Sequence, residues 1–271
     1  MIIKIDLHTH TTASDGVYSP SELVSHAHSA GVEILAVTDH DTVDGLEEAQ
    51  VAAKTQGIQL IPGAEFSATW AGMTLHVLGL GFDPSNRSLQ QALAEVQSVR
   101  DSRAKVIGEK LERLGIANAY QRTHDLTVNG NLTRTHFAQL LVNDGRVRTR
   151  QEAFKRFLGQ GRGAYVSCQW PPMAQVIGRI NTAGGKAVVA HLQRYKLNAK
   201  SRAELVKDFA RGDGAGLEWA PSISAEMIRL ARQFDLKSTV GSDFHAPRSG
   251  PNLGSIAPPT EIPPLFGTPI I

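Results

Sequence analysis

Histidines and carboxylates recur in this sequence at points where a short apolar run ends. His8 and His10 are separated by one residue, and because side chains alternate along an extended chain, both imidazoles project from one face. Imidazole and carboxylate ligands without thiolates suit Mn, Fe or Zn, and a carboxylate such as Glu65 can bridge two ions. The same residue types follow other apolar runs, at Asp6, Thr38-Asp39-His40-Asp41, Glu65, His76, His191 and Ser242-Asp243-Phe244-His245.

A barrel of βα units would bring these residues together, because catalytic groups in barrel enzymes gather at the carboxyl ends of the strands. Short β-branched runs alternate with amphipathic segments in the first hundred residues and again after residue 170, which predicts an α/β fold. Strands are expected at 2–6, 33–38, 58–61, 186–190, 216–219 and 238–241, with a hairpin of 65–70 and 73–80. Helices are expected from the Ser19…Glu22 capping box to Gly31 and at 46–56, 173–182, 201–211 and 224–234.

The middle of the chain differs in pattern and charge, and we interpret 99–168 as an inserted helical lobe within a barrel made of 1–98 and 169–271. Helices are expected there at 88–114, 133–144 and 149–158. Between Arg100 and Trp170, thirteen Lys or Arg face six Asp or Glu, a net charge of +7 that leaves −5 for the remainder. This asymmetry suits an anionic substrate held against a cation-binding site, although solvated helix surfaces account for many such charges.

Other classes of protein fit the sequence less well. No run of eighteen apolar residues occurs, and the first residues lack the pattern of a signal peptide, so we expect a cytoplasmic protein without a membrane partner. The single cysteine, Cys168, excludes an internal disulfide and agrees with a reducing compartment. The Pro-rich tail after Pro247 has no periodicity and is expected to be an extended wrap or disordered.

Several ordered motifs resemble those of the PHP (polymerase and histidinol phosphatase) family, and together they are far more specific than a single His-x-His. They are Asp6-Leu7-His8-Thr9-His10, Ser14-Asp15-Gly16, Thr38-Asp39-His40-Asp41, Gly63-Ala64-Glu65 and Gly241-Ser242-Asp243-Phe244-His245. The resemblance covers nearly the whole chain. It implies a distorted (β/α)7 barrel, similar to a TIM barrel, with the helical lobe inserted and two or three divalent ions bound, Mn being favoured over Fe or Zn.

Motif matching to this family also assigns the ligands. One ion would be held by His8, His10, Glu65 and Asp243, a second by Glu65, His76 and His191, and a third by Asp15, His40 and His245. Asp6, Asp39 and Asp41 have no ligand position in this scheme. We expect them to serve the structure or to orient imidazoles through hydrogen bonds.

Within the family, the lobe resembles a bacterial branch that includes 3′,5′-nucleotide bisphosphate phosphatases and 5′–3′ exoribonucleases. The likeness rests on 133–138, 161–166 with Gln169-Trp170, and His191 followed by Arg194-Tyr195. It makes Arg134, Arg162 and Arg194 candidates for binding substrate phosphates, because a guanidinium can hold phosphate oxygens bidentately. His136, beside Arg134, is a candidate catalytic proton donor. Phe137, Tyr165 and Trp170 are candidates for stacking on bases, although a place in the buried core is an equally reasonable role for each.

The resulting hypothesis is a phosphoesterase in which a metal-bound hydroxide attacks phosphorus in line and arginines stabilise the developing charge. The substrate would be a nucleotide bisphosphate such as pAp (adenosine 3′,5′-bisphosphate) or a short 5′-phosphorylated RNA. The segments Leu192-Gln193 and Trp219-Ala220-Pro221 depart from that branch, which leaves substrate preference open. Histidinol phosphatase, metal-dependent amide hydrolysis and a non-catalytic metal-binding or nucleic-acid-binding module are the alternatives. The sequence indicates no oligomeric state.

Overall fold

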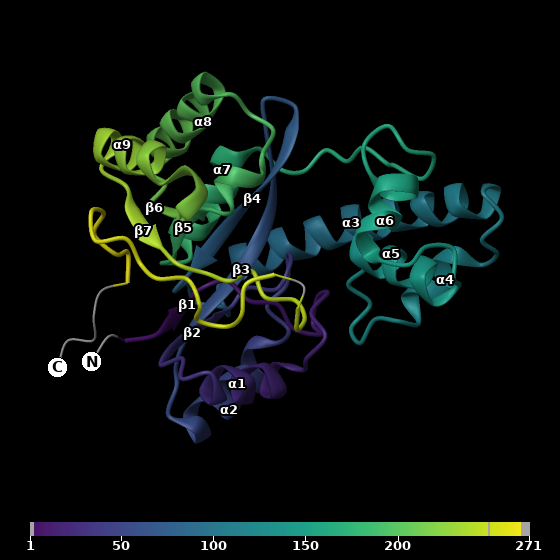
Figure 1. The fold of residues 1–271 in the computed structure, drawn as a ribbon, viewed down its shortest axis with the longest axis horizontal. Coiled ribbons are helices and arrows are strands. Elements are labelled where there is room, and N and C mark those ends of the chain that lie inside the picture. Colours follow the sequence, from purple (N-terminus) through teal and green to yellow (C-terminus); the bar gives the residue numbers. More distant parts are fainter. Residues whose placement is uncertain (1–2, 249, 267–271) are drawn as a thin grey trace.

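The computed structural model describes residues 3–248 and 250–266 and has two parts joined by one long helix (Figure 1). A twisted sheet is surrounded by helices, and a smaller helical lobe lies to one side of it. Helix α3 (Arg87–Arg113) extends from the sheet region into the lobe. Among the described residues, no helix combines the length and the apolar character needed to cross a membrane.

Seven strands form the sheet, in the order in which they occur in the sequence. They are β1 (Ile5–Asp6), β2 (Ile34–Val37), β3 (Gln59–Trp70), β4 (Met73–Leu80), β5 (Lys186–Val189), β6 (Gly216–Glu218) and β7 (Lys237–Thr239). β4 runs antiparallel to both neighbours, and all other neighbours are parallel. Beyond the first and last strands, the Leu7 amide donates to the Val240 carbonyl at 2.8 Å, and Thr9 pairs with Phe244. The expected distorted seven-stranded barrel is confirmed.

The third strand is longer than predicted. Segments 58–61 and 65–70 were expected to be separate, but β3 is continuous, and it pairs with β4 without interruption from Gly63 opposite Leu80 to Trp70 opposite Met73. Gly63 does not break the strand. A Cβ atom there would lie 2.8 Å from a methyl group of Thr38, so this glycine permits close packing of neighbouring strands. Glu65 therefore lies inside a strand.

Five helices cover the sheet, and their ends follow local sequence signals. They are α1 (Pro20–Ser29), α2 (Leu46–Gln56), α7 (Met173–Thr182), α8 (Ala199–Arg211) and α9 (Ser224–Phe234). The predicted capping box of α1 is present: the Ser19 hydroxyl accepts from the Glu22 amide at 3.2 Å, and the Glu22 carboxylate accepts from the Ser19 amide at 2.8 Å. α8 begins two residues before the predicted position because Asn198 caps it.

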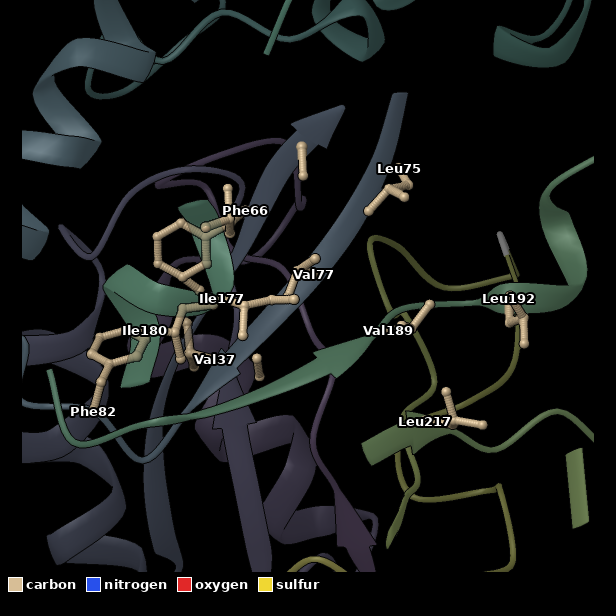
Figure 2. Packing of buried hydrophobic residues seen from close by; sticks show 14 of the residues in the cluster. Val37, Phe66, Leu75, Val77, Phe82, Ile177, Ile180, Val189, Leu192 and Leu217 are labelled. Atoms are coloured by element: carbon tan, nitrogen blue, oxygen red, sulfur yellow. The ribbon is translucent and has the colours of Figure 1, made fainter. Parts of the chain in front are cut away.

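The main hydrophobic core lies between the sheet and these helices. Figure 2 shows Phe66 and Phe82 beside Ile177 and Ile180, where α7 packs on β3 and β4. Gly79 makes room for this contact, since a Cβ atom there would lie 2.7 Å from the Phe66 ring. The described tail also contributes: Leu253 and Ile262 belong to this core, and the Ser238 amide donates to Pro263. Residues 250–266 thus form the extended wrap.

The lobe has a hydrophobic cluster of its own, made by buried residues between Ala104 and Ala164. Its helices are the outer part of α3, then α4 (Ala119–His124), α5 (Arg134–Asn143), α6 (Arg150–Ala153) and the π-helix η1 (Phe154–Leu158). Two predictions were incomplete here. α4 was not predicted, and the single helix expected at 149–158 changes to a π-helix at Phe154. The separate cluster is consistent with an inserted unit, while the boundaries 99–168 stay a prediction.

Candidate metal centre

The nine predicted ligands converge at one end of the barrel and contact one another. They come from the loops after β1 (His8, His10, Asp15), β2 (His40), β5 (His191) and β7 (Asp243, His245), and from β3 (Glu65) and β4 (His76). Residues separated by more than two hundred positions therefore lie side by side, because the carboxyl ends of parallel strands meet at one edge.

Glu65 is the centre of this cluster. Its side chain is only 1% exposed, and its two oxygens face five imidazoles. Oε1 lies 2.8 Å from Nδ1 of His76 and 2.9 Å from Nε2 of His191. Oε2 lies 3.0 Å from Nδ1 of His40, 3.3 Å from Nε2 of His10 and 3.5 Å from Nε2 of His8. One carboxylate thus joins two groups of nitrogen atoms, as a bridging ligand would.

Two aspartates complete the cluster on either side of Glu65. Oδ1 of Asp243 lies 3.1 Å from Nε2 of His10, 3.2 Å from Nε2 of His8 and 3.5 Å from Nδ1 of His245. Oδ1 of Asp15 lies 3.3 Å from Nε2 of His245 and 3.9 Å from ring nitrogens of His10 and His40. Each aspartate therefore shares histidines with the other and with Glu65.

The residues of this cluster fit divalent ions. Three groups of potential ligand atoms each lie within 4.8 Å of one another: His8, His10, Glu65 and Asp243; His10, Asp15, His40 and His245; and His40, Glu65 and His76. The first group is the predicted one. The group around Asp15 contains the predicted Asp15, His40 and His245 and, in addition, His10. The group of His40, Glu65 and His76 has His40 in place of the predicted His191. Buried atoms without a hydrogen-bond partner among the described residues include Nε2 of His8 and His10, Nδ1 of His40, Oδ1 of Asp15 and Oε2 of Glu65. Such atoms are costly to bury unless they bind something.

Electrostatics favour bound positive charge here. Burial raises the pKa of Glu65, but the imidazoles of His76 and His40 outweigh burial and hold that pKa well below the usual range. Burial lowers the pKa of His10, but the nearby carboxylates of Asp243 and Glu65 outweigh burial and raise it to about 10. The carboxylates thus attract protons onto His8 and His10, whereas burial dominates at His40 and lowers its pKa. Divalent ions would take the place of those protons on binding.

Glu218 is a functional residue that the sequence reasoning missed. Its Oε1 lies 2.7 Å from Nδ1 of His8, and its Oε2 accepts a hydrogen bond from the His191 amide. A carboxylate that holds the second nitrogen of a ligating histidine fixes the orientation of the ring. Gly241 permits this arrangement, because a Cβ atom there would lie 2.8 Å from Oε1 of Glu218. The signal available in the sequence was the position of Glu218 at the end of a strand, β6, since the candidate ligands also follow strands.

Asp6, Asp39 and Asp41 hold the loops that carry the ligands. Asp39 accepts from the Ser14 hydroxyl at 2.5 Å, and Ser14 lies 3.4 Å from Nδ1 of His10. Among the described contacts, none of the three carboxylates bonds an imidazole directly. Asp6 and Asp41 thus serve the structure, which was one of the two expected roles, and Asp39 reaches His10 through Ser14.

A cavity of about 380 Å³ lies between this centre and the lobe. Asp15, His40 and His76 line it on the barrel side. Its cationic lining residues are Arg100, Arg103, Arg134, Arg194 and Lys196. Arg134 and Arg194 were predicted to bind phosphate, and the structure places both at the cavity. Arg162 does not line it but is exposed in a turn, and its role in phosphate binding is left as a prediction.

Arg100 and Arg103, one turn apart on α3, were missed from the sequence. Arg100 is buried and donates to Asp41, so its charge is paired. Arg103 forms no ion pair within the described part of the chain. Burial, together with nearby Arg134 and Arg100, lowers the pKa of Arg103 to about 10. Both guanidinium groups lie over the Trp170 ring, at 5.3 Å and 5.6 Å from its centroid.

The remaining lobe candidates have different positions. Tyr165 and Trp170 line the cavity, whereas Phe137 is fully buried in the lobe core, which is the second of its two expected roles and excludes stacking on a base. Nδ1 of His136 accepts from the Thr133 amide at 3.1 Å, which caps α5. Burial lowers the pKa of His136, so it is neutral near pH 7. This arrangement favours a positioning role, and its catalytic role stays a prediction.

Residues 6–218 match the PHP domain family. The chain belongs to the PHP domain family. A 5′–3′ exoribonuclease of Haemophilus influenzae is 44% identical over 259 residues, which cover 94% of each protein. A 3′,5′-nucleoside bisphosphate phosphatase of Chromobacterium violaceum is 38% identical over 253 residues, 91% of this PHP chain and 89% of that protein.

A solved structure of a Chromobacterium violaceum amidohydrolase with bound sulfate and no metal has a TM-score of 0.92 and 34% identity with this PHP chain. The alignment covers 97% of this chain and 94% of that one. These relatives confirm the family and the branch that the sequence motifs indicated, and they show that the chain is a PHP hydrolase.

Proposed function

We propose that this protein is a metal-dependent phosphoesterase that removes the 3′-phosphate of nucleotide bisphosphates such as pAp and degrades short 5′-phosphorylated RNA from the 5′ end. The observation that carries the proposal is the cavity in which three cations, Arg103, Arg134 and Lys196, lie beside a cluster fitted for metal ions. Among the described residues, none of these three forms an ion pair, whereas Arg100 pairs with Asp41 and Arg194 with Asp243. This arrangement of unpaired cations beside a candidate metal cluster suits a substrate with two anionic groups, one bound by the cations and the other attacked at the metal ions. The names of the H. influenzae and C. violaceum relatives describe both activities.

The residues divide the work as follows. The nine ligands would hold two or three divalent ions, with Mn favoured, and these ions would polarise the phosphate and lower the pKa of water. Glu218 keeps His8 in position. Arg103 and Arg134 would bind the 5′-phosphate through charge-assisted hydrogen bonds, and Arg194 would contact the attacked phosphate. The lobe at 99–168 would thus be the substrate-binding insertion.

A comparison of three substrates tests this function. The Mn²⁺-loaded protein is incubated separately with pAp, with a 5′-phosphorylated short RNA and with histidinol phosphate, and products are resolved over time. Release of phosphate from pAp and of 5′-mononucleotides from RNA is expected, and Glu65→Gln should release neither. Turnover of histidinol phosphate alone, or of none of the three, would overturn the proposal.

A further inference from the structure

A second cavity, of about 310 Å³, borders the metal centre and is lined only by barrel residues. His191 and Asp243 belong to its lining, whereas Asp15, His40 and His76 face the first cavity. Nδ1 of His76 and Nε2 of His191 both contact Oε1 of Glu65, at 2.8 Å and 2.9 Å. The candidate metal centre therefore lies between the two cavities, and a substrate bound at the ions can extend into both.

The two cavities differ in charge. The first has five cationic residues and one carboxylate, Asp15, in its lining. The second has one cationic residue, Arg194, which lines both cavities, and two carboxylates, Glu218 and Asp243. A terminal phosphate is therefore favoured in the first cavity and disfavoured in the second. The second cavity instead presents the half-buried Trp219 and the exposed polar side chains of Gln193 and Ser222. An indole and hydroxyl or amide groups suit an uncharged base and sugar.

The proposed chemistry requires a binding site for the nucleotide that follows the cleaved bond. In both substrates the oxygen of water joins phosphorus, the bond from phosphorus to the 3′ oxygen breaks, and a proton passes to that departing oxygen. In pAp the attacked phosphorus carries no further group. In RNA it also carries the 5′ oxygen of the second nucleotide, whose sugar and base must lie near the ions. The shortened RNA keeps this phosphate as its new 5′ end.

We infer that the second cavity holds the sugar and base of the second nucleotide of a 5′-phosphorylated RNA, with the base stacked on Trp219. The first nucleotide then lies in the first cavity with its 5′-phosphate among the lobe arginines. This inference rests on the proposed function and adds the feature that separates RNA cleavage from bisphosphate hydrolysis. A nucleotide bisphosphate leaves the second cavity unused.

Filling the second cavity tests the inference. Ser222 is exposed and is not among the buried core residues, so Ser222→Trp should fold. Ser222→Ala is the matched control. For Ser222→Trp, kcat/KM on a 5′-phosphorylated dinucleotide should fall about tenfold. Its kcat/KM on pAp should stay within about twofold of the wild type. Equal losses on both substrates, or no loss on the dinucleotide, would overturn the inference.

Two further measurements examine stacking itself. Removing the second base from the dinucleotide should lower kcat/KM about tenfold for the wild type and have no effect on Trp219→Ala. A dinucleotide with a photoreactive second base should crosslink to the peptide that contains Trp219 and Ser222. Crosslinking only to lobe peptides would contradict the inference. A wild type that hydrolyses pAp but not RNA would also overturn it while leaving the phosphatase function intact, whereas inactivity on both would overturn the proposed function.

Discussion

The barrel lines the first cavity with imidazoles and carboxylates, together with Arg194 and Lys196, whereas the charged groups of the lobe are arginines. The two parts position these groups by different means. Most of the barrel's imidazoles and carboxylates lie on short loops directly after strands, and Glu65 and His76 lie within β3 and β4, so backbone pairing fixes their places. The lobe presents arginines from α3 and α5, whose direction depends on packing: Arg100 and Arg103 lie over the Trp170 ring, and Arg134 lies over the Phe154 ring. Site residues near strand ends can therefore be recognised from the few residues around them in the sequence. Site residues on a helix face can be recognised only once the packing of the helix is known.

Glu65→Gln breaks the barrel side and has the largest expected effect. The substitution keeps the shape but removes the charge that faces five imidazoles. We expect kcat/KM on pAp to fall about a thousandfold, equivalent to ~4 kcal/mol. The control is Glu226→Gln, whose carboxylate pairs with Arg202 at 2.9 Å outside both cavities, and it should keep its activity. Comparable activity in the two variants would contradict the bridging role.

Glu218→Gln probes the support behind the ligands. Loss of the carboxylate weakens the hold on Nδ1 of His8, so the concentration of Mn²⁺ needed for half-maximal activity should rise about tenfold to a hundredfold. Saturating Mn²⁺ should restore most of the turnover. An unchanged Mn²⁺ requirement would show that His8 is held without this contact.

On the lobe side, Arg103→Met is compared with Arg162→Met. A hydrogen bond to a charged group contributes ~1.5 kcal/mol or more, so KM for pAp should rise about tenfold for Arg103→Met with kcat little changed. Arg162 is exposed and lies outside the cavity lining, and its variant should resemble the wild type. The reverse order would restore the assignment made from the sequence likeness.

Cys168 reports on the same cavity with the smallest effect. Burial raises the pKa of its thiol, although Arg103 and Arg100 act in the opposite direction. At about pH 8 less of the thiol is ionised than in a free cysteine, so alkylation by iodoacetamide should be slower, and its rate should rise at higher pH than that of a free cysteine. Because Cys168 lines the cavity, pAp should slow alkylation severalfold. Alkylation at the rate of free cysteine, unaffected by pAp, would place the substrate elsewhere.

The sequence predicted the barrel and its ligands because each signal was local. The His8 and His10 pair, the capping box at Ser19 and the start and end of α2 depend on a few adjacent residues. Asp243 and His245 could be added because they follow another short apolar strand. Glu218 was missed although it also ends a strand, since a single glutamate without a motif around it does not stand out.

The lobe arginines could not be selected in the same way. The periodicity of α3 predicts a helix but not that Arg100 pairs with Asp41 while Arg103 remains unpaired beside it. Arg162 was chosen by likeness, and it lies exposed in a turn outside the cavity lining. Likewise, Phe137 is an aromatic residue near Arg134 in sequence, yet it completes the lobe core.

Metal content measured together with activity tests the central claim most directly. The protein is stripped with a chelator, reloaded with Mn²⁺, freed of unbound ions and analysed for bound metal while phosphate release from pAp is followed. We predict that the stripped protein is inactive, that activity returns as two or three ions bind per chain, and that Glu65→Gln retains fewer ions. Full activity in stripped protein without bound metal would contradict the account.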